Sequence, residues 1–435
     1  MNLSKVKAIA VVLTMAVAAS AQFNSFENAR TRALSGAPLS DISDIYNYPV
    51  LMMGYLNHAQ VTWNGAGETE GGANFGSFIF TKSINDMIAL GVTYTPVNFL
   101  SGTGFDDFTL VPGLSGSRLP STPHLLLGFD LGMLKLGADL FFQHNANTRE
   151  DRTETPGGAA TNDNKDRVMN FGTRLSADLE FGDIGILAKL GFGFPSILRD
   201  NKQTTAAGDN NNIKNEATGL YLETGAEVSY PLFGIDLTAG FEYTTVNIQR
   251  KEDVPAPAIT LLPYDDNRNS LFSVYLAGEV NIMETAAAVV AYEYSRRTGT
   301  TTVTSGTTDD QTATKTTAGA SMHSIYAGVE NSWDNAWKFD NLQLRTGLQY
   351  NIISSVSNTD NDRNGSFVKT SSWADREFVK PIVGLGLSKG VITIDMALSF
   401  GRMFDDEDEG SRDYYEWRGL LAGPTMAAAS LTIKF

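Results

Sequence analysis

The chain has 435 residues, of which 42% are hydrophobic and 19% are charged, and its formal net charge is -16. This acidic balance excludes a polyanionic partner, so no nucleic acid is expected, because phosphate groups would be repelled. The chain has no cysteine, which excludes disulfides, thiolate chemistry and a lipid-modified cysteine after export.

Residues 1–21 have the organisation of a secretory signal peptide. Lys5 and Lys7 precede an apolar run from Ala8 to Ala19, and Ala-Ser-Ala at 19–21 forms a cleavage site. The apolar run is too short to span a bilayer comfortably. An N-terminal membrane anchor is the alternative, and no later stretch could form a mature transmembrane helix. The protein is therefore predicted to be exported.

The segment from 22 to 50 is not strand-like. Its run from Asn28 to Pro49 resembles the N-terminal segment of the FadL/PorV-like outer-membrane family, which reads A-R-x-x-A-x-G-G-A, then an acidic pair, then N-P-A. The run departs from that pattern at Ser35 and inserts Tyr48 before the proline. The resemblance implies a hatch or lining inside the periplasmic mouth of a barrel, and an ordinary amphipathic leader is the alternative. The hatch-like positions are Arg30, Gly36, Asp41, Asp44 and Asn47.

From Leu51 onward the sequence alternates between apolar and polar residues. In Phe233 to Thr244 every second residue is apolar, and the intervening ones are Gly, Asp, Thr and Glu. Leu342 to Ile352 and Val391 to Arg402 repeat this pattern. Period-two alternation predicts strands with one apolar and one more polar face. The small and polar residues of the second face suit the crowded interior of a barrel.

Short and long connections alternate along the chain, which favours an up-and-down barrel. Short ones, such as Asp130–Gly132 and Tyr230–Leu232, are followed by long polar ones. Short periplasmic turns and long outer loops are typical of transmembrane barrels. The long connections are predicted as loops at Ser101–Ser121, Asn145–Asp166, Asp200–Asn215, Lys251–Asn269, Thr298–Thr317, Asn358–Ser372 and Met403–Gly419.

The fold class predicted is all-β, a transmembrane antiparallel barrel over residues 51–435 with a short plug-like N-terminal segment. About 16 strands are counted, and 14 is the alternative because Tyr55–Trp63 and Phe75–Lys82 are the weakest candidates. Thr425 to Phe435 alternates and ends on an aromatic residue. In this it resembles the closing strand of outer-membrane barrels, which the barrel-assembly machinery recognises.

Alternation also predicts which charged side chains point into the barrel. They could pair across strands to stiffen the wall, or they could form a polar conduction path. Arg174, Arg345 and Lys380 are candidates to pair with Asp41 and Asp44 of the N-terminal segment. The predicted lumen-facing charges are Lys135, Asp139, Arg174, Asp178, Glu223, Glu227, Asp236, Glu242, Glu279, Glu293, Arg345, Lys380, Asp395 and Lys434.

No catalytic motif is present, so an enzyme is not expected. The histidines at 58, 124, 144 and 323 have no metal-like or triad-like spacing, and each is predicted to be a girdle or loop residue. Asp360, Asp362 and Asn364, followed by Gly365, offer oxygen ligands at alternate positions. They form a possible Ca²⁺ site, with a plain polar loop as the alternative. No other cofactor is expected.

These observations predict a protein of the bacterial outer membrane, surrounded by lipid and lipopolysaccharide. The family resemblance implies a channel for hydrophobic or small amphipathic solutes. The alternative is a PorV-like scaffold that transports nothing and holds a secreted or surface partner.

Overall fold

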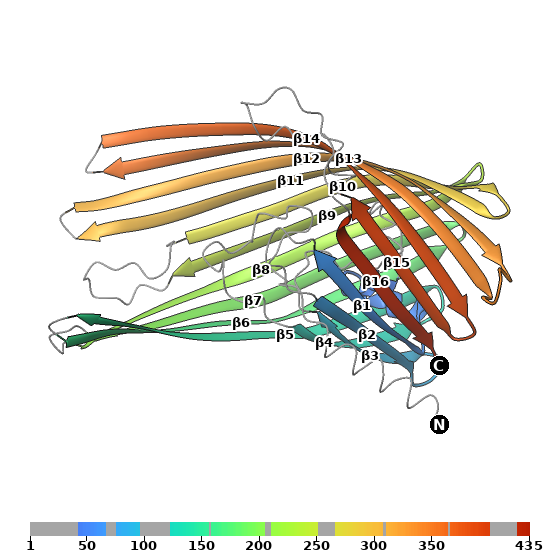
Figure 1. Cartoon of the computed structure of the whole chain (residues 1–435), viewed down its shortest axis with the longest axis horizontal. Helices are drawn as coiled ribbons and strands as arrows, with labels where there is room; N and C mark the ends of the chain where they lie inside the picture. The colour runs from blue at the N-terminus through green and yellow to red at the C-terminus, as the bar shows by residue number, and fades with distance from the viewer. Residues whose placement is uncertain are drawn as a thin grey trace.

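The computed structural model describes residues 42–66, 75–95, 122–155, 158–204, 210–250, 266–307, 310–363, 366–400 and 424–435. Within these ranges sixteen antiparallel strands form a closed barrel, in which each strand pairs with its neighbours in sequence and β1 pairs with β16 (Figure 1). The strands are β1 His58–Ala66, β2 Phe75–Ser83, β3 Ile88–Thr95, β4 Thr122–Asp130, β5 Leu134–Thr155, β6 Gly158–Phe181, β7 Ile184–Thr204, β8 Asn210–Leu232, β9 Ile235–Arg250, β10 Asp266–Met283, β11 Ala286–Thr307, β12 Asp310–Asp334, β13 Asn341–Arg363, β14 Ser366–Lys389, β15 Ile392–Phe400 and β16 Pro424–Lys434.

The predicted count of about sixteen strands is confirmed, and the alternative of fourteen is wrong. The two weakest candidates correspond to β1 and β2, which pair with each other, and β1 also pairs with β16 to close the barrel. Phe435 packs at this seam. Its backbone N–H donates to the carbonyl of Asn57 at 2.9 Å, and its ring stacks on that of Phe80 with the centroids 5.4 Å apart.

The two faces of the strands are those of a membrane barrel, with apolar side chains exposed on the outside and charged side chains buried on the inside. Large apolar side chains such as Val92, Leu190 and Leu348 are 46–47% exposed on the outside, whereas Arg345 and Asp139 on the inside are each 1% exposed. A water-soluble protein has the opposite order. A closed barrel also leaves no unpaired sheet edge at membrane depth. The protein is therefore a transmembrane β-barrel. None of the described helices is long and apolar enough to cross a bilayer.

Several connections predicted as loops are instead paired strands, so those predictions are wrong. Asn145–Thr155 of β5 pairs with the first residues of β6. The other stretches are also mostly paired, each between the two strands that it was expected to connect: Asp200–Asn215 in β7 and β8, Thr298–Thr317 in β11 and β12, and Asn358–Ser372 in β13 and β14. These stretches are polar on both faces, so hydropathy loses its period of two while the backbone ladder continues. Figure 1 shows β5–β14 extending well past β1–β4, β15 and β16. The predicted loops at 101–121 and 403–419, and most of 251–269, lie outside the described residues.

The two faces of β13 should respond differently to a new charge. Leu348 is 46% exposed on the outer face near the middle of the apolar belt, and the adjacent Gln349 is half-buried inside. Leu348→Arg should destabilise the inserted barrel by about 2–4 kcal/mol, because it would place a charge in hydrocarbon. Gln349→Arg should cost clearly less. Urea unfolding in lipid vesicles measures both, and equal losses would contradict the assignment of faces.

Candidate functional site

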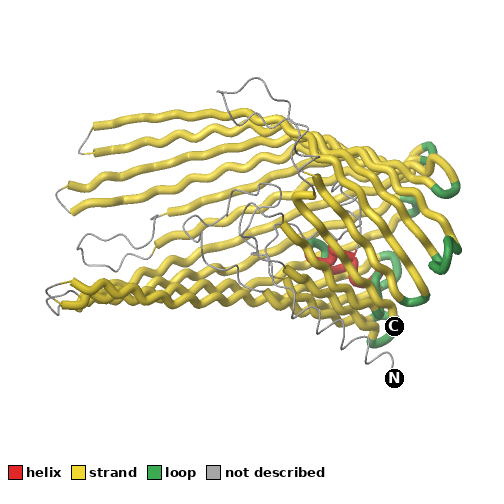
Figure 2. The backbone as a smooth tube through the Cα atoms, in the orientation of Figure 1, coloured by secondary structure: helices red, strands yellow, loops and turns green. Residues whose placement is uncertain are grey.

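Two short 3₁₀ helices lie inside the barrel at the end that carries the short turns (Figure 2). They are η1, Ile42–Tyr46, and η2, Pro49–Gly54, and we call residues 42–56 the mouth segment. The carbonyl of Asp44 accepts from the N–H groups of Asn47 and Tyr48 at 2.9 and 2.7 Å, which turns the chain between the two helices. Pro49 begins η2, where its missing N–H costs nothing.

The wall beneath the mouth segment is shaped to receive it. Gly128 of β4 lies directly opposite Gly137 of β5. A side chain at Gly137 would overlap the backbone of Val50, and a Cβ at Gly128 would come within 2.5 Å of the sulfur of Met53. The backbone N–H of Val50 donates to Ser176 Oγ of β6 at 2.8 Å. Because the two glycines have no side chains, the backbone of the segment can pack directly against the backbone of the wall.

Two tyrosines of the segment contact strands on either side of β4–β6. Tyr46 is buried, and its hydroxyl donates to the carbonyl of Phe78 in β2 at 3.2 Å. Burial raises the pKa of the Tyr46 phenol well above its usual value, so it remains a neutral donor. The ring of Tyr48 lies under Lys189 Nζ of β7, with 4.9 Å between the nitrogen and the ring centroid. This is a cation–π contact between the segment and the wall.

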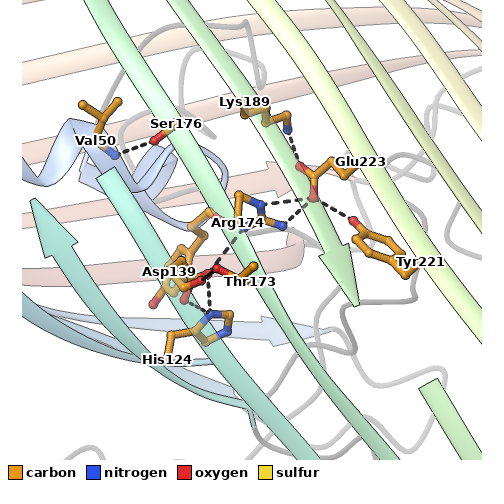
Figure 3. A network of polar contacts seen from close by, with 10 residues as sticks. Val50, His124, Asp139, Thr173, Arg174, Ser176, Lys189, Tyr221 and Glu223 are labelled. Carbon is orange, nitrogen blue, oxygen red and sulfur yellow. Dashed lines mark hydrogen bonds and ion pairs between the residues drawn. The ribbon is translucent and has the colours of Figure 1, made fainter. Parts of the chain in front are cut away.

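A buried network of charges connects the segment to β5–β9, and Figure 3 shows its members on β5–β8. Arg174 of β6 donates to the Tyr46 carbonyl, and its Nη2 lies 2.7 Å from Oε2 of Glu223 in β8. Lys189 bridges two carboxylates, at 2.7 Å from Glu223 Oε1 and 2.8 Å from Glu242 Oε1 of β9. Glu223 is 3% exposed, and buried charges of this kind are stable only when they are paired.

The network continues to a buried histidine. His124 Nδ1 of β4 lies 2.8 Å from Asp139 Oδ2 of β5, which is 3.9 Å from Arg174 Nη1. An ionised carboxylate only accepts hydrogen bonds, so Nδ1 carries the ring proton in this contact. The prediction that His124 is a girdle or loop residue is wrong. It lies inside the wall beside Tyr46, with ring centroids 6.5 Å apart.

A second buried network lies across the barrel, on β12–β15. Arg345 of β13 is within 2.5 Å of Glu330 Oε2 and 2.6 Å of Asp395 Oδ1, and it also donates to Gln343 Oε1. Tyrosines satisfy two further inward carboxylates. Tyr275 donates to Glu227 at 2.5 Å, and Tyr326 donates to Glu293 at 2.8 Å. The inward charges described so far are therefore bonded within the wall.

The predicted lumen-facing charges differ in burial. Asp236, near a turn, and Lys434 are exposed. Lys135 lies 2.6 Å from Glu180 and 3.6 Å from Asp178. The buried members are Asp139, Arg174, Glu223, Arg345 and Asp395. The half-buried ones are Lys135, Asp178, Glu227, Glu242, Glu279, Glu293 and Lys380.

Of the hatch-like positions, Asp44 and Asn47 lie in the mouth segment, and Arg30, Gly36 and Asp41 lie outside the described residues. The candidate calcium ligands Asp360 and Asp362 lie in β13, opposite Lys369 and Phe367 of β14, and Asn364 is outside the described residues. This is extended backbone and not the wrapped loop that was expected. Calcium binding there stays a prediction. No group of three or more potential metal ligands occurs among the residues that the structure describes.

Sequence reasoning missed several residues of the site. Lys189 was not predicted, although it alternates with the outward Ile186, Leu190 and Phe192, and that pattern could have identified it. Ser176 and Gly137 gave no signal, because their roles depend on where the mouth segment lies.

No family model matches the chain, and no curated protein matches it. Among solved structures, a Pseudomonas aeruginosa FadL homologue is similar, with 13% identity, a TM-score of 0.43, and coverage of 96% of this chain and 100% of that one. The Pseudomonas putida toluene transporter TodX has 11% identity and a TM-score of 0.38, over 94% and 98%. CdiB from Escherichia coli has 11% identity and a TM-score of 0.38 over 87% of this chain, which spans 62% of the CdiB chain. At these values the neighbours assign no role to any residue here.

Proposed function

We propose that the protein is an outer-membrane channel for hydrophobic or small amphipathic solutes, and that the mouth segment controls passage through it. The observation that carries this proposal is how the segment is held. It packs inside the barrel against β3–β6 and contacts the wall through separate polar groups. The barrel ladder is complete without it, so the segment can move without breaking strand pairing.

The inward wall beyond the charged network includes buried apolar side chains. Phe141 lies two residues farther from the turn end than Asp139, and Val246 and Ile248 lie four and six residues beyond Glu242. All three are apolar, and each is at most 1% exposed. Other atoms cover these side chains, and the buried inward residues of the barrel also include the polar Asn170, Asn269, Ser324 and Asn351.

A disulfide between the segment and the wall tests the proposal. The chain has no cysteine, so Val50→Cys with Ser176→Cys introduces the only thiol pair, at positions whose backbone N and Oγ are 2.8 Å apart. In reconstituted vesicles the oxidised variant should take up an apolar fluorescent probe several-fold more slowly than the same sample after reduction. The single Ser176→Cys variant is the control, and it should not respond to reductant.

The scaffold remains the second candidate, because the paired strands of β5–β14 extend beyond the belt and offer a large outer surface. Uptake no faster than in empty vesicles, with the disulfide both closed and open, would contradict the channel and support the scaffold.

A further inference from the structure

The outer face of β10–β12 has an unusual group of polar side chains where the apolar belt ends. Along β11 the outward residues are Val290 and Tyr292, 59% and 43% exposed, then Tyr294 and the exposed Arg296. His323 of β12 is also exposed and lies directly opposite Tyr294. We call Tyr292, Tyr294, Arg296 and His323 the rim cluster.

The two tyrosines orient the histidine. The hydroxyl of Tyr292 lies 2.7 Å from His323 Nδ1, and the ring of Tyr294 lies beside the imidazole with 5.0 Å between centroids. The phenol can donate to Nδ1, which leaves the ring proton on Nε2, and a protonated ring has a proton there as well. In both forms Nε2 is a hydrogen-bond donor on the outside of the barrel.

The surface around the rim cluster is basic. Arg268 of β10 and Lys315 of β12 are exposed farther from the turns, opposite Thr300 and Thr302 of β11. The described outward side chains of β10–β12 include no carboxylate. Asp360 of β13 lies opposite Lys315 and offsets its charge. The positive charge is therefore centred on Arg296.

The height of Arg296 matches a lipid head group. Ala286 begins β11 at the end of the strand nearest the short turns, and Arg296 lies ten residues farther along the strand. At about 3.3 Å per residue and a tilt of about 40°, this is about 25 Å above the periplasmic rim, which is the thickness of the apolar band of such barrels. Arg and an imidazole N–H are preferred donors to phosphate oxygens, and tyrosine favours the interface.

We propose that the rim cluster binds the phosphate group of a phosphorylated glycolipid of the outer leaflet. Arg296 donates to two phosphate oxygens, and His323 Nε2 donates to a third. Tyr292 and Tyr294 hold the imidazole in place and cover the first part of the acyl chains. The site is outside the barrel and does not depend on passage through it.

Native mass spectrometry of the full-length barrel in detergent tests this proposal, with lipid A, chemically dephosphorylated lipid A and inorganic phosphate as separate probes. The wild type should retain lipid A and not the dephosphorylated form. Arg296→Gln with His323→Gln should weaken retention about tenfold or more, because it removes the cationic guanidinium and the imidazole N–H that donate to the phosphate. Tyr292→Phe removes one hydroxyl and should weaken it several-fold.

Arg167→Gln is the matched control. Arg167 is exposed on β6 beyond the outward Met169 and Phe171, and its cross-strand neighbours are Ala146 and Leu198. This variant should retain lipid A as the wild type does. Equal retention by all variants, or retention of dephosphorylated lipid A, would overturn the proposal. Binding of inorganic phosphate at the same strength would assign a site for soluble anions and overturn the lipid assignment. If the double variant does not fold, lipid A retention by Tyr292→Phe is compared with that by Arg167→Gln. Weaker retention by Tyr292→Phe supports the proposal, and equal retention overturns it.

Discussion

Gly137→Ala should displace the mouth segment and raise the permeability of the barrel. The new Cβ would overlap the backbone of Val50. Strand β5 cannot shift outward to make room, because it is hydrogen-bonded to β4 and β6 on its two sides. One methyl group therefore prevents Val50 from packing on position 137, while the strand pairing of the barrel stays intact. We expect uptake of an apolar probe by reconstituted vesicles to rise several-fold, and chymotrypsin to cleave within residues 42–56, which contain Tyr and Leu and neither Lys nor Arg.

Gly191→Ala is the matched control for this substitution. Gly191 also lies on the inner face, in β7, but its added Cβ would meet its nearest atom, Glu223 Oε2, at 3.4 Å, which is ordinary contact. This variant should keep the segment protected and the uptake unchanged. If Gly137→Ala left both protease protection and uptake at the wild-type level, the close seat of Val50 would be wrong. A loss of protection without any gain in uptake would favour the scaffold over the channel.

Arg345→Met should produce the largest loss of stability in the wall. Arg345 is 1% exposed between Glu330 and Asp395, which would then lose their shared cation while they remain inside. Removing one partner of a buried ion pair costs about 3–5 kcal/mol, because the remaining charge stays in a mostly buried site without that counter-ion. Urea unfolding of the barrel in vesicles measures the loss.

Lys135→Met tests whether burial causes this effect. Lys135 also pairs with two carboxylates, but its side chain is 25% exposed and that of Glu180 is 60% exposed. Water screens such a pair, so its loss should cost about 1 kcal/mol or less. Similar losses for the two variants would show that Arg345 does not act through its buried charge.

Strand pairing could be predicted from the sequence within the apolar belt, but not in the strand extensions beyond it. Outward side chains in the belt must be apolar, so β9 and β13 showed their period of two directly in the sequence. Beyond the belt both faces meet water. The Thr-rich stretch of β11 and β12, from Gly299 to Ala318, lost its period although Thr300 to Thr304 pair with Ala313 to Thr317. Pairing there depends on backbone hydrogen bonds, which leave no trace in hydropathy.

The sequence by itself determined the barrel and the two faces of the strands in the belt, because alternation is a local property that the bilayer imposes on each strand separately. It counted about sixteen strands and left fourteen open, and the closed pairing of β1 with β2 and β16 decided for sixteen. Only the tertiary structure decided which charges meet. Arg174, Arg345 and Lys380 were equal candidates to pair with Asp41 and Asp44 of the N-terminal segment, and Arg174 contacts the segment by donating to the carbonyl of Tyr46. That choice depends on strand register and on the path of the segment across Gly128 and Gly137. Both are set by contacts between residues far apart in the chain.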